Sequence, residues 1–105
     1  DFCPENSYQD YPQPIGYNAT ISAPHMHAMA LELLKDHLRD GSTVLDIGSG
    51  SGYLTTCMAL MASILDDKKG KVVGIDHIKG LVDLSISNIS KHHRDLLMDG
   101  RITMV

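Results

Sequence analysis

A run of apolar residues that meets an acid and then a cluster of glycines constrains this chain more than any other feature. The segment reads Val44-Leu45-Asp46-Ile47 followed by Gly48-Ser49-Gly50-Ser51-Gly52. Glycine adopts positive φ without steric cost and lets a ligand lie directly against the backbone. A strand that runs into such a loop, with a helical pattern after it, binds nucleotide-like ligands at the first strand-to-helix turn of a doubly wound sheet. The sequence therefore predicts an α/β fold with a ligand site at this loop.

The spacing of apolar residues predicts three helices, because residues three or four positions apart share one helix face. The first begins at Pro24, which suits a first helical turn, and ends at Asp40-Gly41; its predicted buried face carries Met26, Ala30, Leu33, Leu34 and Leu38. The second follows the glycine loop and carries Leu54, Cys57, Met58, Met61, Ile64 and Leu65. The third carries Ile78, Leu81, Val82, Ile86 and Ile89.

Short apolar runs predict strands at 43–47, at 71–76 and from about Arg101 onward. Strands that alternate with helices imply right-handed crossovers and a parallel sheet. Residues 1–23, rich in proline and tyrosine, are predicted to form an irregular arm, and residues 92–100 a hydrophilic loop. Three strands would leave an apolar edge open, and a parallel sheet needs cover on both faces. We therefore expect residues 24–105 to be the first βα units of a larger domain, with only the N-terminal half of its sheet present.

Composition argues against several classes of protein. The formal charge of −4, the pI near 5.8 and the scattered lysines and arginines argue against nucleic-acid binding, which needs a basic stripe. The sequence has neither a long apolar run for a membrane span nor a signal peptide, so a cytosolic location is expected. Cys3 and Cys57 match no zinc or redox spacing.

The acid at Asp46 discriminates between possible ligands of the glycine loop. A carboxylate at this strand end would repel the anionic pyrophosphate of a dinucleotide and attract an ammonium or sulfonium group. S-adenosylmethionine carries both cations, and its carboxylate can use amides at a helix N-terminus. Asp76, at the end of the next predicted strand, can accept hydrogen bonds from a ribose diol, which would also suit NAD. Asp46 and the position of Gly52 favour the methyl donor, with S-adenosylhomocysteine as its product.

A second unusual patch runs from Thr20 to His27, where hydroxyl groups precede the first predicted helix. The Ser22 hydroxyl could cap that helix or act in catalysis, and the residues alone leave both readings open. His25 and His27 would lie about 200° apart around a helix axis, so they cannot chelate one ion. The adjacent pair His92-His93 has no further ligand at metal-binding spacing. No metal site is predicted.

Four segments carry a resemblance to a known family: 11–17 (Tyr-Pro-Gln-Pro-Ile-Gly-Tyr), 19–28 (Ala-Thr-Ile-Ser-Ala-Pro-His-Met-His-Ala), the glycine loop with 53–55, and 70–78 (Gly-Lys-Val-Val-Gly-Ile-Asp-His-Ile). Together they closely resemble the protein-L-isoaspartate (D-aspartate) O-methyltransferases. The glycine loop occurs in many methyltransferases, whereas the 19–28 segment is specific to this family. The resemblance implies a Rossmann-like class I S-adenosylmethionine-dependent fold. It also implies methyl transfer to the free carboxylate of L-isoaspartyl or D-aspartyl residues in damaged proteins, which starts their repair.

The resemblance also implies site residues. Ser22 matches the active-site serine, and we assign Thr20 beside it to catalysis as a second hydroxyl donor. The positions that match the family's cofactor site are Ala19, Thr20, Ile21, Ser22, His27, Ser51, Asp76 and His77. To these the loop itself adds Asp46, Gly48, Ser49, Gly50 and Gly52. Because the acceptor carboxylate is ionised at neutral pH, no general base is required. Neutral hydroxyls would orient it, and alignment would supply most of the rate.

Other readings remain open at this point. The chain could belong to a class I methyltransferase with a different acceptor, to a binding module that holds the cofactor without catalysis, or, more distantly, to a dehydrogenase. We expect isoaspartyl-containing proteins as partners and a monomer. One position departs from the family: Gly80 stands where relatives often carry glutamate, on a face predicted to point to solvent.

Overall fold

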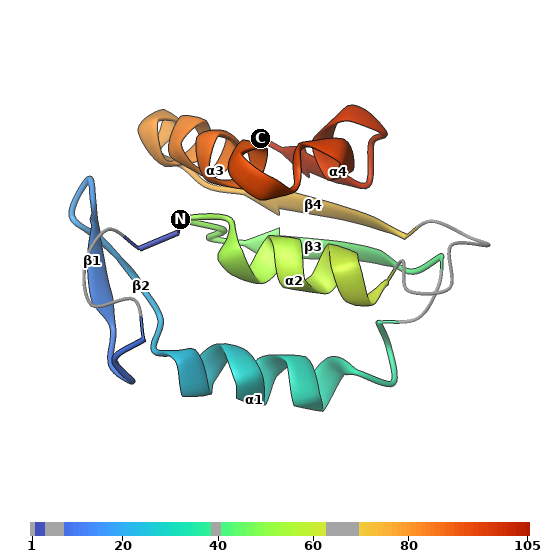
Figure 1. Ribbon diagram of the computed structural model, residues 1–105, viewed down its shortest axis with the longest axis horizontal. Coiled ribbons are helices and arrows are strands. Elements are labelled where there is room, and N and C mark those ends of the chain that lie inside the picture. Colours follow the sequence, from blue (N-terminus) through green and yellow to red (C-terminus); the bar gives the residue numbers. More distant parts are fainter. Residues whose placement is uncertain (1, 4–7, 39–40, 63–69) are drawn as a thin grey trace.

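The computed structural model describes residues 2–3, 8–38, 41–62 and 70–105. These residues form two separate sheets, one with two strands and one with three (Figure 1). The elements, in chain order, are β1 (Gln13–Gly16), β2 (Ala19–Ile21), α1 (Pro24–Leu34), β3 (Thr43–Ile47), α2 (Tyr53–Met61), β4 (Lys71–Ile75), α3 (Lys79–His92), α4 (Arg94–Met98) and β5 (Ile102–Met104).

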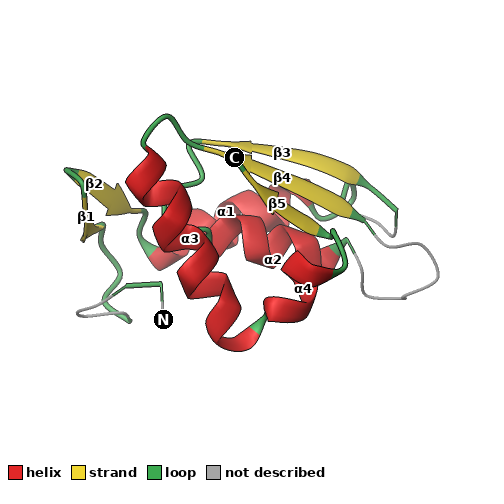
Figure 2. Cartoon of the chain, turned by 90° about the horizontal axis from the view of Figure 1, so that it is seen from above, coloured by secondary structure: helices red, strands yellow, loops and turns green. Residues whose placement is uncertain are grey.

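The three-stranded sheet is parallel, as the sequence predicts, with the order β3-β4-β5. The helices lie on one side of it (Figure 2). Successive crossovers of one hand that move in one direction along a sheet place their helices on the same face. Burial accordingly alternates along the strands: Val72 and Ile102 are buried beneath the helices, whereas Leu45 and Ile47 on the opposite face are 58% and 74% exposed.

The core lies between this sheet and the helices. It is formed by Leu38, Met58, Ala59, Val72, Ile89, Leu96 and Ile102, which come from five elements and the turn after α1. Phe2 packs against the same cluster from the N-terminal segment. Non-directional apolar burial therefore ties the βα units to one another.

Residues 13–21 correct the prediction of an irregular arm, because they form an antiparallel hairpin (Figure 1). Gln13 lies opposite Ile21, and the chain reverses at Tyr17 and Asn18, which have φ of 55° and 58°. A two-residue turn with positive φ at both positions matches the twist of a hairpin. Asparagine tolerates this conformation, but tyrosine rarely adopts it, so the turn was not recognisable from its residue types.

Helix α1 begins at Pro24 as predicted but ends at Leu34, short of the predicted end at Asp40-Gly41. Its predicted buried face is confirmed only at Leu38, which is buried in the core just after the helix. No residue within α1 is buried, Leu33 is 73% exposed, and Leu31, which was not predicted, packs against the core. Leu38 enters the core just after the helix, and the Ser42 hydroxyl donates to the carbonyl of His37. After the helix, the amides of His37 and Leu38 both donate to the carbonyl of Leu34, so the chain turns there and carries Leu38 into the core.

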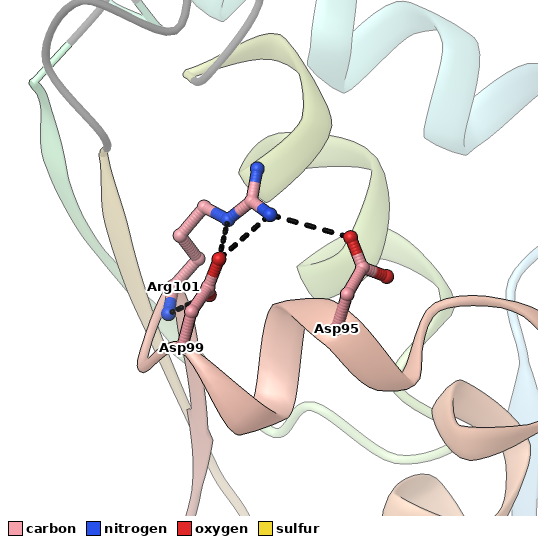
Figure 3. A network of polar contacts seen from close by, with 3 residues as sticks. All are labelled: Asp95, Asp99 and Arg101. Atoms are coloured by element: carbon pink, nitrogen blue, oxygen red, sulfur yellow. Dashed lines mark hydrogen bonds and ion pairs between the residues drawn. The ribbon is translucent and has the colours of Figure 1, made fainter.

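The region 92–100 corrects a second prediction, since α4 replaces the expected loop. Its Leu96 is buried in the core, which holds a helix too short to be stable alone. Arg101 closes the turn into β5 (Figure 3): its guanidinium lies 2.7 Å from Asp99 and 3.3 Å from Asp95. The strand predicted near Arg101 follows as β5.

The remaining helix predictions are mixed. Helix α2 follows the glycine loop as predicted, but Ile64 and Leu65 lie outside the described residues. In α3, Leu81 and Ile89 are buried as predicted, whereas Ile86 is 38% exposed and Asn88 is buried in its place. In the part of the chain that the structure describes, none of the helices has the length and apolar character to cross a bilayer.

Candidate active site

The loop between β3 and α2 is held by backbone hydrogen bonds to the end of β4. The amides of Gly48 and Ser49 both donate to the carbonyl of Ile75, at 2.8 and 2.9 Å. Gly52 has φ of 86°, and a side chain there would come within 3.0 Å of Ser85 on α3. Only glycine combines this conformation with so close an approach, so Gly52 lets α2 begin directly against α3.

Asp76, which follows β4, fixes the middle of the same loop. Its side chain is 7% exposed. One carboxylate oxygen accepts the amide hydrogen of Gly50 at 3.0 Å, and the other accepts that of Ile78 at 3.2 Å. Asn88 of α3 donates its side-chain amide to the carbonyl of Ser51 at 3.1 Å. The loop is thus anchored from two neighbouring elements.

A cavity of about 260 Å³ lies between this loop, the hairpin and α1. It contains most of the predicted site residues, from segments far apart in the sequence. Figure 1 shows the hairpin at the end of the molecule to which β3 and β4 point. The cavity is lined by Thr20, Ile21, Ser22, Met26, His27, Ala30, Asp46, Ile47, Gly48, Ser49, Gly50, Ser51 and Leu54.

Asp46 faces this cavity from β3 and is partly buried. One carboxylate oxygen accepts a hydrogen bond of 2.6 Å from the Thr55 hydroxyl. Burial raises the pKa of the Asp46 carboxyl above its ordinary value, and the Thr55 hydrogen bond and the charge of His27 oppose that shift. A cation bound beside Asp46 would offset the cost of burying its charge.

His27 belongs to α1 and faces Tyr53 of α2 and Asp46 of β3. Its ring stacks on Tyr53 with the centroids 4.9 Å apart and an interplanar angle of 27°. Burial lowers the pKa of His27, and the charge of Asp46 opposes the shift. The neutral ring therefore forms a wall of the cavity, beside the carboxylate of Asp46.

Ser22 lies between β2 and α1, and its role as a helix cap is excluded by the structure. The N-cap of α1 is Ala23, and no side chain caps this helix. The amide of Met26 donates instead to the carbonyl of Ala23. The exposed Ser22 side chain lines the cavity together with Thr20, so both hydroxyls remain available to a ligand.

Four predicted cofactor residues lie outside the lining of this cavity: Ala19, Gly52, Asp76 and His77. Gly52 and Asp76 shape the loop from behind, whereas His77 is 90% exposed with its Nδ1 atom 3.5 Å from Asp76. Their contact with a cofactor stays a prediction. Among residues 2–3, 8–38, 41–62 and 70–105, no three His, Cys, Asp or Glu side chains gather as a metal site would require.

Gly80 corrects a further expectation. It was predicted to face solvent, but a side chain at this position of α3 would overlap the aromatic ring of Tyr17, and its Cβ would lie 2.8 Å from the phenol oxygen. The hairpin turn therefore rests on α3 at the one position without a side chain. Glycine within a helix costs about 1 kcal/mol relative to alanine, and close packing is the usual reason for it.

The sequence missed several residues of the site. Met26 and Ala30 line the cavity, although their spacing suggested core positions. Tyr53, which stacks on His27, follows the last glycine without any distinguishing pattern. A second cavity of about 300 Å³ adjoins the first and shares Ile21, Ser22 and His27 with it. It depends on the hairpin, so its lining could not be predicted without that element.

Comparison with known proteins identifies relatives over nearly the whole chain. The sequence profile of the family described as protein-L-isoaspartate(D-aspartate) O-methyltransferase (PCMT) matches residues 1–104. A protein-L-isoaspartate O-methyltransferase of Caenorhabditis elegans is 54% identical over 105 residues, which are all of this chain and 45% of the relative. Protein-L-isoaspartate O-methyltransferase 2 of Arabidopsis thaliana is 60% identical over 86 residues, 82% of this chain and 26% of the relative.

Among solved structures, a Plasmodium falciparum protein assigned to the protein-L-isoaspartate O-methyltransferases superposes with a TM-score of 0.92 at 41% identity. That crystal structure is a complex with S-adenosyl-L-homocysteine, and the superposition covers 99% of this chain and 48% of that one. The chain thus spans less than half the length of the relatives that it matches.

Proposed function

The chain belongs to the protein-L-isoaspartate(D-aspartate) O-methyltransferase family, and from this premise we propose that the complete enzyme is a repair methyltransferase. It transfers a methyl group from S-adenosylmethionine to the free carboxylate of L-isoaspartyl and D-aspartyl residues in damaged proteins. "Complete enzyme" here means a full-length protein that contains this chain. Residues 24–105 supply the first βα units of its Rossmann-like methyltransferase domain, which the likeness in fold supports.

One observation carries the proposal: two hydroxyl side chains from the hairpin face the glycine loop and a carboxylate across one cavity. Thr20 and Ser22 form one wall, and Asp46 with the loop forms another. A transferase must bring its donor and its acceptor together in such a space.

The residues of the cavity suit S-adenosylmethionine. Asp46 can pair with a cationic group. The buried Ser49 hydroxyl lines the cavity and has no hydrogen-bond partner among the described residues, so a polar ligand group would satisfy it. Backbone amides at the start of α2 can receive a carboxylate. When bound, the cofactor supplies an electrophilic methyl group on its sulfonium.

The hydroxyls suit a carboxylate acceptor. Such a group is ionised at neutral pH, so Ser22 need not remove a proton. Because the carboxylate loses its charge as the ester forms, a cationic residue beside it would stabilise the reactant more than the transition state. Neutral hydroxyls hold the carboxylate in place without that penalty. Ser22 and Thr20 therefore act by orienting the acceptor.

The deciding experiment compares methylation of isoaspartyl and normal aspartyl peptides by the complete enzyme. We expect transfer to the isoaspartyl peptide alone. Ser22→Ala should lower turnover far more than affinity for S-adenosylhomocysteine, because the hydroxyl is proposed to orient the acceptor. Transfer to another acceptor would indicate a different class I methyltransferase. Cofactor binding without transfer would indicate a binding module, and nicotinamide binding a dehydrogenase.

The pH dependence of the reaction provides a second check. Because no general base is invoked, the rate of methylation should be nearly flat from mildly acidic to mildly basic pH after correction for ester hydrolysis. A steep rise near pH 7 that disappears in His25→Gln or His27→Gln would contradict the orienting role of Ser22 and indicate base catalysis.

We also propose that the enzyme acts in the cytosol as a monomer, on isoaspartyl-containing proteins. The acidic composition and the lack of a basic stripe support protein substrates over nucleic acids. Light scattering of the complete enzyme tests the oligomeric state, and a stable dimer would overturn that part of the proposal.

A further inference from the structure

The second cavity contains no residue of the glycine loop 48–52 in its lining. It shares Ile21, Ser22 and His27 with the first cavity, so the two meet at the proposed acceptor-orienting hydroxyl. Its walls include four aromatic residues, whereas the first cavity has no Phe or Tyr in its lining, and they come from the N-terminal segment, the hairpin, α1 and the start of α2. The aromatic residues are Phe2, Tyr8, Tyr11 and Tyr53.

Gln13 of β1 also lines this second cavity, and its burial is unusual. The residue is 6% exposed, and its carboxamide nitrogen has no hydrogen-bond partner in the part of the chain that the structure describes. A buried donor without a partner costs about 1–3 kcal/mol. The great majority of such groups are satisfied in native proteins, so an exception needs an explanation.

Gln13 and the proposed acceptor-orienting Ser22 line the same cavity. Gln13 lies directly opposite Ile21, which precedes Ser22, and residues opposite one another in an antiparallel pair project from the same face. Only two buried side-chain atoms lack a partner among the described residues, and each lines one of the two adjoining cavities: Ser49 in the first and Gln13 in the second. This distribution fits two ligands that meet at Ser22.

The chemistry of Gln13 indicates what the second ligand presents. A carboxamide N–H donates to a carbonyl or carboxylate oxygen. The reacting carboxylate is already assigned to the hydroxyls of Ser22 and Thr20, so the oxygen that remains is a peptide carbonyl next to it. Aromatic walls suit such a chain, because flat rings pack against peptide planes and apolar side chains at low entropic cost.

We propose that Gln13 is a substrate-binding residue: its carboxamide N–H donates to a peptide carbonyl that flanks the methylated carboxylate, with the acceptor chain lying in the aromatic cavity. This inference rests on the proposed function. It gives the enzyme a contact with the polypeptide itself, and thereby a preference for peptides over free amino acids.

The first test replaces Gln13 by leucine in the complete enzyme, with the exposed Ser87 of α3, which lines neither cavity, as the control. Gln13→Leu should raise KM for an isoaspartyl peptide roughly tenfold, with little change in KM for S-adenosylmethionine. Ser87→Leu should leave both constants within twofold. Gln13→Glu, which offers acceptors in place of the donor, should raise KM for the peptide at least as much; an unchanged KM in this variant would overturn the donor role.

A second test identifies the partner atom and excludes a purely structural role. Two isoaspartyl peptides are made in which the carbonyl on one or the other side of the isoaspartyl residue is replaced by an (E)-alkene. With the wild-type enzyme, one of these analogues should have a kcat/KM roughly tenfold below that of the unmodified peptide. With Gln13→Leu, the same analogue and the unmodified peptide should have equal kcat/KM values. Additive losses, or a lower Tm for Gln13→Leu with unchanged peptide KM, would overturn the inference. Gln13→Met provides a second apolar replacement if the leucine variant does not fold.

The two proposals fail in different ways. If the wild-type enzyme methylates no isoaspartyl peptide, the proposed function is wrong. If it methylates the peptide and Gln13→Leu behaves like wild type with both alkene analogues, the function stands and the role of Gln13 is wrong.

Discussion

The two walls of the first cavity are built in different ways. The glycine loop is fixed by hydrogen bonds to β4, to Asp76 and to Asn88 of α3. The hairpin belongs to a separate sheet, and it meets the rest of the molecule mainly through side chains, such as the ring of Tyr17 on Gly80. A rigid wall suits a donor that must be held identically in every turnover. A wall held by packing can adjust to acceptors that differ in sequence.

The largest effect expected from this comparison is at Asp76. Asp76→Asn removes the negative charge that accepts hydrogen bonds from the amides of Gly50 and Ile78. It also places the side-chain NH₂ group against one of these two amides. The loop therefore loses a charge-assisted hydrogen bond worth about 1.5–3 kcal/mol. Affinity for S-adenosylhomocysteine, measured by calorimetry, should fall roughly 10–100-fold. The control is Asp83→Asn, which removes an exposed carboxylate of α3 that pairs with Lys79 and lines neither cavity. An affinity within twofold of wild type would mean that Asp76 does not hold the loop.

A smaller effect is expected where the hairpin rests on α3. Gly80→Ala should displace the ring of Tyr17, so turnover should fall a few-fold while cofactor affinity stays constant. The Tm should not fall, because alanine favours the helix by up to about 1 kcal/mol. Tyr17→Ala should lower turnover similarly, and the double variant should lose no more than either single one. Independent losses would show that the two residues do not act as one contact.

The smallest effect concerns His27, which joins the two walls. Unfolded histidine takes up a proton near pH 6.5, whereas burial lowers the pKa of His27 in the folded state. As the pH falls through 6.5, the unfolded chain gains a proton that the folded chain lacks, so the free energy of unfolding decreases. The raised pKa of Asp46 acts in the opposite direction, because its folded state takes up a proton first.

Denaturant unfolding of the complete enzyme at about pH 7.5 and 5.5 measures this effect. His27→Gln should flatten the decrease in stability, whereas replacement of the exposed His37 by glutamine should leave it as in wild type. If both variants behave alike, His27 is not the group that titrates, and the stacked ring does not couple the two walls.

The loop side of the site could be predicted from the sequence and the hairpin side could not. Residues 44–52 carry their structure locally: an apolar strand, an acid at its end and glycines at positive φ. The hairpin turn at Tyr17 and Asn18 has no glycine, and contacts outside α1 decide that Leu31 packs against the core while Leu33 stays exposed. The resemblance to the family identified Ser22 as a site residue. It assigned no role to Gln13 or Tyr53, although both lie in the segments that carry the resemblance.

By itself, therefore, the sequence determined the order of strands and helices in the βα units, the parallel sheet and the position of the ligand loop. These follow from periodicity and backbone preference, which act over a few neighbouring residues. Only the tertiary structure decided which walls the hairpin forms, where α1 ends and which polar groups are buried without a partner. Those features depend on contacts between residues far apart in the chain, and the free energy of such contacts is not encoded in any local pattern.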